Sequence, residues 1–161
     1  HQFWEESILK MKANGIGAAE WADWGGFKME ANDSIKANLA ITDASGARAM
    51  IHSDSALGAQ RLNQEVAKAM YAGRAAGIPI TEDQALKWLT INPAWALGLD
   101  DKIGSIEVGK NADVVLWSGN PFSVYTKAEK VWIDGAMLFD RADATERWRT
   151  DFELGTVKEN N

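Results

Sequence analysis

Three polar residues, His52, Ser53 and Asp54, follow directly on a largely apolar run at residues 47–51. That run predicts a buried strand, so the polar residues would stand at its C-terminal mouth, where (β/α) barrels place catalytic and metal-binding groups. A carboxylate there is a hard oxygen ligand for a divalent metal and accepts a proton from a reacting water. Asp54 is therefore the first candidate for chemistry. The alternative is that Ser53 or Asp54 only caps the following helix.

His52 stands two positions before Asp54, and alternate side chains of a strand share a side, so these two side chains would lie together. His52 then contacts a substrate, supports Asp54, or has a structural role. Trp24 and Lys28 follow a short predicted strand at 16–19, in a loop on the side where barrel enzymes bind substrates. Substrate recognition by these two residues and packing against neighbouring structure are equally open.

Elements that alternate between strand and helix surround these residues. Apolar side chains at helical spacing predict four helices, with Asp33 or Ser34 capping the second and Thr81 capping the fourth. Pro93 fits the first turn of a further short helix that ends at Gly98. Such alternation favours a parallel sheet and an α/β architecture. The predicted helices span residues 5–14, 35–43, 57–72 and 82–89.

The pattern changes after about residue 103, where short strands replace helices. An apolar strand is predicted at 113–117, and two more at 128–133 and 136–139 flank Asp134-Gly135. An Asp-Gly pair between two strands is a strong hairpin signal. The chain thus divides into residues 1–103 and residues 104–161.

Several segments, read in order, resemble the C-terminal part of a metal-dependent amidohydrolase of the imidazolonepropionase-related group. They are Ser53-Asp54, the stretch Thr90 to Gly98 with its Asn92-Pro93-Ala94, and the stretch Gly104 to Trp117. The resemblance implies that residues 1–103 are the last β/α units of a (β/α)8 TIM barrel. It also implies that residues 104–161 are strands of a small composite β domain with a helical tail. A complete barrel takes about 250 residues, so we expect a longer parent protein.

The same resemblance implies roles for single residues. Asp54 would close the eighth strand as both metal ligand and proton shuttle, and His1 would be the metal-binding histidine of the sixth strand, unless it is the remnant of a tag. Zinc is the expected metal of the parent protein. The family's His-x-His pair has no counterpart among the two histidines present. This segment alone is therefore expected to bind zinc weakly or not at all and to have little activity.

The expected activity of the parent is hydrolysis of carbon–nitrogen bonds other than peptide bonds, with cyclic amides as the expected substrates. A deaminase or dipeptidase on the same scaffold, or a non-catalytic interaction domain, are the alternatives. Residues 104–110 have the Gly-x4-Gly-Lys spacing of a phosphate-binding loop, but Asn111 replaces the required Ser or Thr. We therefore expect a turn of the β domain there.

The composition and net charge of the chain exclude some classes of binding partner. The net charge is −6 and no basic patch is evident, which argues against nucleic acid and anionic membranes. No run of 18 apolar residues suits a membrane span. The expected partners are a small-molecule substrate and further copies of the chain, since a partial barrel leaves strand edges and apolar faces uncovered.

Overall fold

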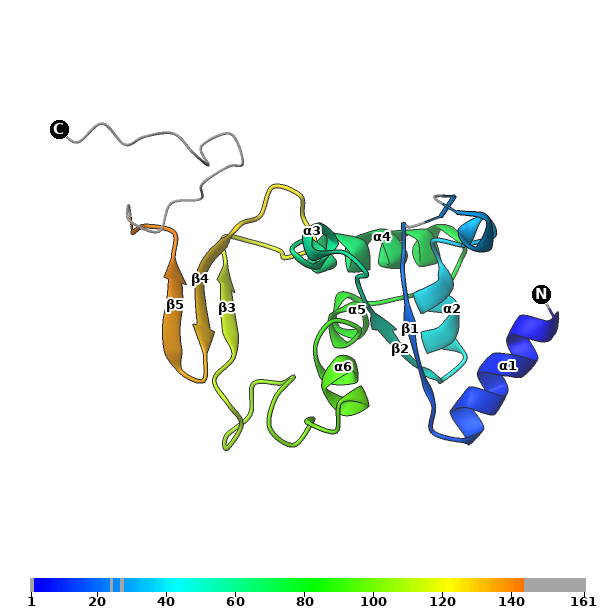
Figure 1. The fold of residues 1–161 in the computed structure, drawn as a ribbon, viewed down its shortest axis with the longest axis horizontal. Helices are drawn as coiled ribbons and strands as arrows, with labels where there is room; N and C mark the ends of the chain where they lie inside the picture. Colours follow the sequence, from blue (N-terminus) through cyan, green and yellow to red (C-terminus); the bar gives the residue numbers. More distant parts are fainter. Residues whose placement is uncertain (1, 24, 27, 144–161) are drawn as a thin grey trace.

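The computed structural model describes residues 2–23, 25–26 and 28–143. It is an α/β structure with two small sheets, one parallel and one antiparallel (Figure 1). The strands are β1 (Gly17–Glu20), β2 (Arg48–Ile51), β3 (Val114–Trp117), β4 (Ala128–Ile133) and β5 (Ala136–Asp140). The helices are α1 (Gln2–Ala13), α2 (Asn38–Ala44), α3 (Ala56–Ala59), α4 (Leu62–Ala75), α5 (Glu82–Lys87) and α6 (Ile91–Ala96), with a 3-10 turn η1 (Met29–Ala31).

The parallel pair β1 and β2 is joined by α2, as the alternation of elements predicts. Glu20 lies opposite Ile51 in the register, so the two strands end at the same edge of the sheet. The other side of β2 is occupied by the segment that follows α5. There, Asn92 Nδ2 donates to the carbonyl of Ala49 at 2.8 Å, and the amide of Ile51 donates to the carbonyl of Trp88 at 3.0 Å.

The core lies between this sheet and the helices α2, α4 and α5. Leu39, Val66 and Met70 are fully buried in it, and Trp88 is the largest side chain with no exposed surface. A side chain at Gly73 of α4 would overlap Cβ of Ala40, so glycine is what allows α2 and α4 to approach closely.

Two helix predictions need correction. The helix predicted at 57–72 is broken into α3 and α4 at Arg61, whose backbone (φ −127°, ψ 21°) is not helical. The helix predicted at 35–43 begins only at Asn38, and neither Asp33 nor Ser34 caps it.

The predicted cap at Thr81 is confirmed. Its hydroxyl accepts a hydrogen bond from the backbone N–H of Gln84 at 3.1 Å, and the side-chain oxygen of Gln84 accepts one from the backbone N–H of Thr81 at 2.9 Å. This reciprocal capping box satisfies two amide groups that the helix itself leaves without partners.

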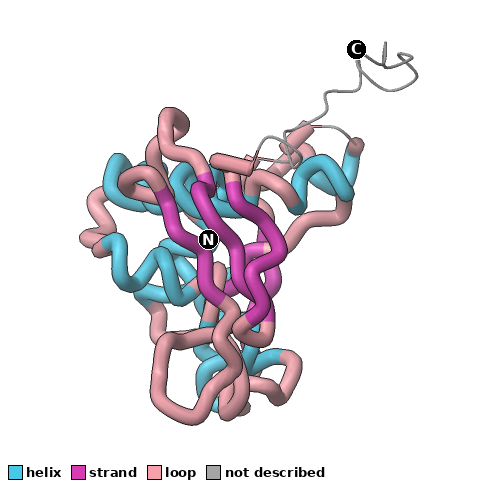
Figure 2. The backbone as a smooth tube through the Cα atoms, turned by 90° about the vertical axis from the view of Figure 1, so that its left-hand side faces the viewer, coloured by secondary structure: helices cyan, strands magenta, loops and turns pink. Residues whose placement is uncertain are grey.

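The antiparallel sheet β3-β4-β5 matches the predicted strands closely, and its hairpin is confirmed. Asp134 (φ 50°) and Gly135 (φ 80°) both have positive φ, which is the requirement of a type I′ turn. Figure 2 shows this sheet in front of the helical part. Its apolar side chains are widely exposed: 50% for Leu116, 52% for Met137 and 56% for Leu138.

The two sheets are connected through the segment before β4. Phe122 reaches into the core of the first part, and Asn63 of α4 donates to the carbonyl of Pro121 at 2.7 Å. Asn120 donates to the carboxylate of Glu82 at 3.0 Å. Within the described residues, no helix is both long enough and apolar enough to cross a membrane.

Candidate functional site

The common end of β1 and β2 brings two ring-bearing residues together. His52 and Trp21 are the first residues beyond these strands, and the His52 amide donates to the carbonyl of Glu20 at 3.2 Å. The Trp21 and His52 rings stack with centroids 4.7 Å apart and planes at 29°. Both residues are partly buried. Burial lowers the pKa of His52, against the opposing charge of nearby Asp54, so the imidazole is neutral at neutral pH.

Asp54 lies just past β2 and is exposed. The capping role considered for Ser53 or Asp54 belongs instead to Ser55, whose hydroxyl accepts from the amide of Gly58 at 3.3 Å. Ser53 stabilises the turn, because its hydroxyl donates to the Ser55 carbonyl at 2.7 Å. The helix cap therefore does not explain an aspartate at position 54.

The loop after β1 is held at several points. Asn38 at the start of α2 donates to the carbonyl of Trp21 at 2.6 Å. Asp23 forms ion pairs with Lys68 at 2.9 Å and with Lys36 at 3.3 Å. The hydrogen bond from Lys68 lowers the pKa of Asp23. These contacts fix the start of the loop against α2 and α4.

A buried carboxyl group, which the sequence analysis did not single out, directly precedes this loop at the end of β1. Glu20 ends β1, and its Oε1 accepts from the Thr42 hydroxyl of α2 at 3.0 Å. Its Oε2 is buried and has no hydrogen-bond partner among the described residues. Burial raises the pKa of Glu20 to about 7 despite the hydrogen bond from Thr42. The only sequence signal is a glutamate that closes an otherwise small, apolar strand.

The predicted site residues are only partly brought together. His52 and Asp54 lie near each other, and Lys28 is exposed in the loop after β1. His1 and Trp24 lie outside the described residues. Within the described part of the chain, no group of three or more His, Asp or Glu side chains could hold a metal ion. Asp54 is a suitable oxygen donor at a strand mouth, but these residues do not complete a metal site by themselves.

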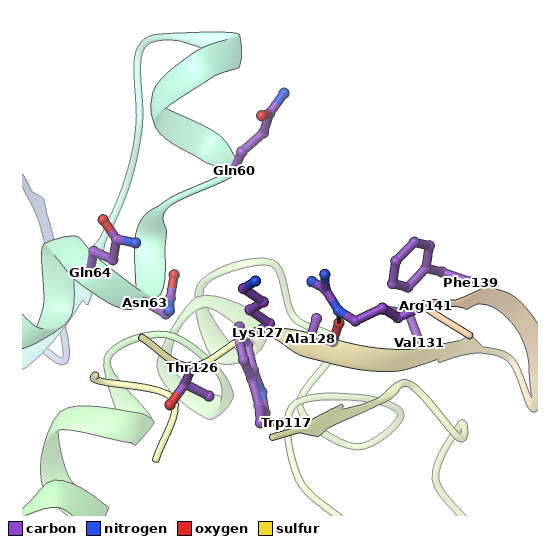
Figure 3. Close-up of a pocket in the computed structure, with 10 residues that line it drawn as sticks. All are labelled: Gln60, Asn63, Gln64, Trp117, Thr126, Lys127, Ala128, Val131, Phe139 and Arg141. Carbon is purple, nitrogen blue, oxygen red and sulfur yellow. Dashed lines mark hydrogen bonds between the residues drawn. The ribbon is translucent and has the colours of Figure 1, made fainter. Parts of the chain in front are cut away.

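A cavity of about 490 Å³ lies apart from this mouth, between α4 and the antiparallel sheet (Figure 3). The helix contributes the side-chain amides of Asn63 and Gln64, and the sheet contributes Trp117, Val131 and Phe139. The sheet side also carries the cationic side chains of Lys127 and Arg141, so apolar and charged groups alternate there.

The glycine-rich stretch before β3 forms turns rather than a helix N-terminus. Lys110 Nζ donates to the carbonyl of Asp100 and to the Ser105 hydroxyl, both at 2.6 Å, and pairs with Glu107 at 3.5 Å. The Lys110 ammonium group is thus already engaged by neighbouring protein groups.

Comparison with known proteins identifies the family. The model of the amidohydrolase family matches residues 26–146, and the chain therefore belongs to this family. Over 84 residues the chain is 36% identical to the amidohydrolase tasK of Hapsidospora irregularis, a match covering 52% of this chain and 8% of that protein. Over 38 residues it is 55% identical to the imidazolonepropionase of Shewanella baltica, covering 24% of this chain and 9% of that protein. The resemblance inferred from the sequence is confirmed.

Solved structures agree with this assignment. An amidohydrolase from Thermotoga maritima superimposes with a TM-score of 0.74 and 32% identity, over 85% of this chain and 35% of that one. An adenosine deaminase from Xanthomonas campestris with bound zinc superimposes with a TM-score of 0.68 and 20% identity, over 92% of this chain and 37% of that one. The second likeness concerns the fold alone. The chain spans little more than a third of either structure.

Proposed function

We propose that this chain is the C-terminal part of a metal-dependent hydrolase acting on carbon–nitrogen bonds other than peptide bonds, with cyclic amides as the first expected substrates. Residues 1–103 would be the last β/α units of a (β/α)8 barrel, and residues 104–161 strands of a small β domain with a helical tail. The family match and the likeness to the Thermotoga maritima amidohydrolase support this proposal.

The observation that carries the proposal is an exposed carboxylate, Asp54, beside a partly buried imidazole where two parallel strands end. Asp54 accepts a proton from the attacking water and delivers it to the departing nitrogen, as a carbon–oxygen bond forms and the carbon–nitrogen bond breaks. His52 contacts the substrate beside it. Lys28, and Trp24 from the same loop, would contact the distal part of the substrate.

A divalent metal, with zinc expected first, supplies Lewis-acid polarisation of the reacting groups when it is bound. The bound zinc of the adenosine deaminase structure supports this choice. Asp54 would be one ligand and His1 a second, and the remaining ligands would come from other strands of the whole enzyme. Besides the small-molecule substrate, we propose further copies of the chain as partners.

The test is the substitution Asp54→Asn in the full-length enzyme that contains this segment, assayed on cyclic amides, aminopurines and dipeptides. The loss of a proton shuttle lowers kcat by about 10² to 10⁴, and loss of a metal ligand adds to that. Asp101→Asn, which changes another exposed aspartate in the same way, is the matched control and should keep normal turnover. Near-normal kcat for Asp54→Asn would refute the proposal.

A further inference from the structure

The stack between Trp21 and His52 joins two segments that are far apart in the sequence. Each residue is the first to leave its strand, and the rings face each other at 4.7 Å with an interplanar angle of 29°. Offset stacking of this kind gives a roughly two- to tenfold preference for the stacked arrangement over a ring that turns freely. The indole therefore covers one face of the imidazole and limits the rotation of that ring.

Both members of the stack also have anchored backbones. The Trp21 carbonyl accepts from Asn38 Nδ2 at 2.6 Å, while the His52 amide donates to the Glu20 carbonyl at 3.2 Å. Ala22, the residue after Trp21, is buried with only 4% of its surface exposed. The two rings thus extend from fixed points, and their contact is a consequence of the parallel register rather than of a mobile loop.

We propose that Trp21 is a positioning residue, held by Asn38, that fixes the His52 imidazole next to Asp54 at the mouth of the parallel strands. This inference rests on the proposed function and deepens it. A site that carries out chemistry needs its groups held within about 0.5 Å of the productive geometry, and packing by neighbouring side chains provides this. Trp21 acts through His52, and its own contact with the substrate is not required.

The stack is tested by nuclear magnetic resonance on this chain, since it has only two histidines. His52→Gln assigns the two sets of ring signals. The indole ring current shifts the His52 ring protons upfield, and Trp21→Leu is expected to abolish that shift. Trp21→Phe restores an aromatic face and should recover most of it. Trp117→Leu, the same change in the distant β3, is the matched control and should leave the His52 signals unchanged.

Asn38→Ala gives a second measurement that keeps the indole. It removes the anchor of the Trp21 carbonyl, so the upfield shift should shrink without vanishing. If Trp21→Leu does not fold, the His52 signals of the Trp21→Phe and Asn38→Ala variants test the proposal instead. His52 signals that stay as in the unmodified chain in every folded variant, Asn38→Ala included, would overturn the proposal.

Kinetics of the full-length enzyme separate this inference from the function itself. Trp21→Leu should lower kcat/KM by about tenfold or more, because a misplaced group weakens transition-state contacts, and Trp21→Phe should recover most of the loss. Unchanged kcat/KM for Trp21→Leu, together with an inactive Asp54→Asn, would overturn the positioning role and leave the proposed function standing. A fully active Asp54→Asn would instead refute the proposed function, whatever the stack does.

Discussion

The parallel strands with their helices differ from the antiparallel sheet β3-β4-β5 in how far each buries its apolar side chains. In the first region one cluster of large apolar side chains is enclosed by the chain itself, and Trp88 and Leu39 in that cluster have no exposed surface. In the second, apolar strands present Leu116 and Leu138 at half exposure or more. The first region therefore has its own hydrophobic core. In the second, several apolar side chains are not covered by any other described part of the chain.

This difference indicates that the first region is stabilised by contacts within the chain, whereas the exposed sheet is a surface for contacts with another chain. Contiguous apolar surface on a folded chain marks an interaction surface or a liability to aggregate. Among the described residues, β3 and β5 are the outer strands of this sheet and have no strand beyond them. We therefore expect core substitutions to change stability and sheet substitutions to change association.

The largest expected effect is that of emptying the core. Trp88→Ala should lower the free energy of unfolding by about 3–5 kcal/mol, because it removes a large buried side chain and leaves a cavity. Leu138→Ala, on the exposed sheet, should change it by less than about 0.5 kcal/mol. Urea unfolding of both variants measures the contrast, and equal losses would mean that the two regions do not differ as described.

The next effect is a dependence on pH that comes from the first region. The pKa of Glu20 is about 7 in the folded chain against an ordinary 4.5, so the folded state holds a proton that the unfolded state releases. The contribution of Glu20 to the free energy of unfolding is therefore greatest below about pH 4.5 and decreases as the pH rises through 7. At pH 8 the free energy of unfolding is lower by about 3 kcal/mol than at pH 4.5. Glu20→Gln should remove this decline between pH 5 and pH 8. A decline as steep in the variant as in the unmodified chain would contradict the assignment.

Asp23→Asn is the control for that experiment. Ion pairing with Lys68 lowers the pKa of Asp23, so its contribution is lost only as the pH falls through that lowered value. Between pH 5 and pH 8, Asp23→Asn should leave the slope of stability against pH unchanged.

Substitutions on the antiparallel sheet are expected to change stability least and to change self-association of the chain clearly. We predict that the chain forms dimers or larger assemblies at tens of micromolar, a rough range for association through exposed strands. Met137→Lys places a charge on the exposed sheet and should shift sedimentation equilibrium towards the monomer, while changing stability by less than about 0.5 kcal/mol. Leu57→Lys, at an exposed leucine of α3, should leave the assembly intact. A stable monomer of the unmodified chain would refute the prediction.

Features that depend on neighbouring residues could be predicted from the sequence. The Asp134-Gly135 turn and the N-cap at Thr81 are each specified within four residues, and both are confirmed. The break at Arg61 comes three residues after Gly58 and accompanies a contact made far along the chain, from Asn63 to Pro121. Local patterns contain no signal for such contacts.

The same limit applies to the site. The strand mouth before Asp54 could be located, because an apolar run that ends in polar residues is a local signal. The stacking of Trp21 on His52 depends on the register between β1 and β2, and the start of α2 depends on the Asn38 amide reaching Trp21. Those arrangements become visible only when the strands are paired, and the roles of Asp54, His52 and His1 stay predictions.

The hydrogen bonds on the outer side of β2 have a consequence for synthesis. Asn92 reaches Ala49 across 43 residues, so the edge of this strand is completed by a segment made much later. At about 5–20 residues per second, translation takes roughly two to nine seconds to cover that distance. During this interval the Ala49 carbonyl lacks the Asn92 side chain as a partner. We therefore expect this side of β2 to gain its final hydrogen bond only after Asn92 has emerged from the ribosome, later than the strand itself.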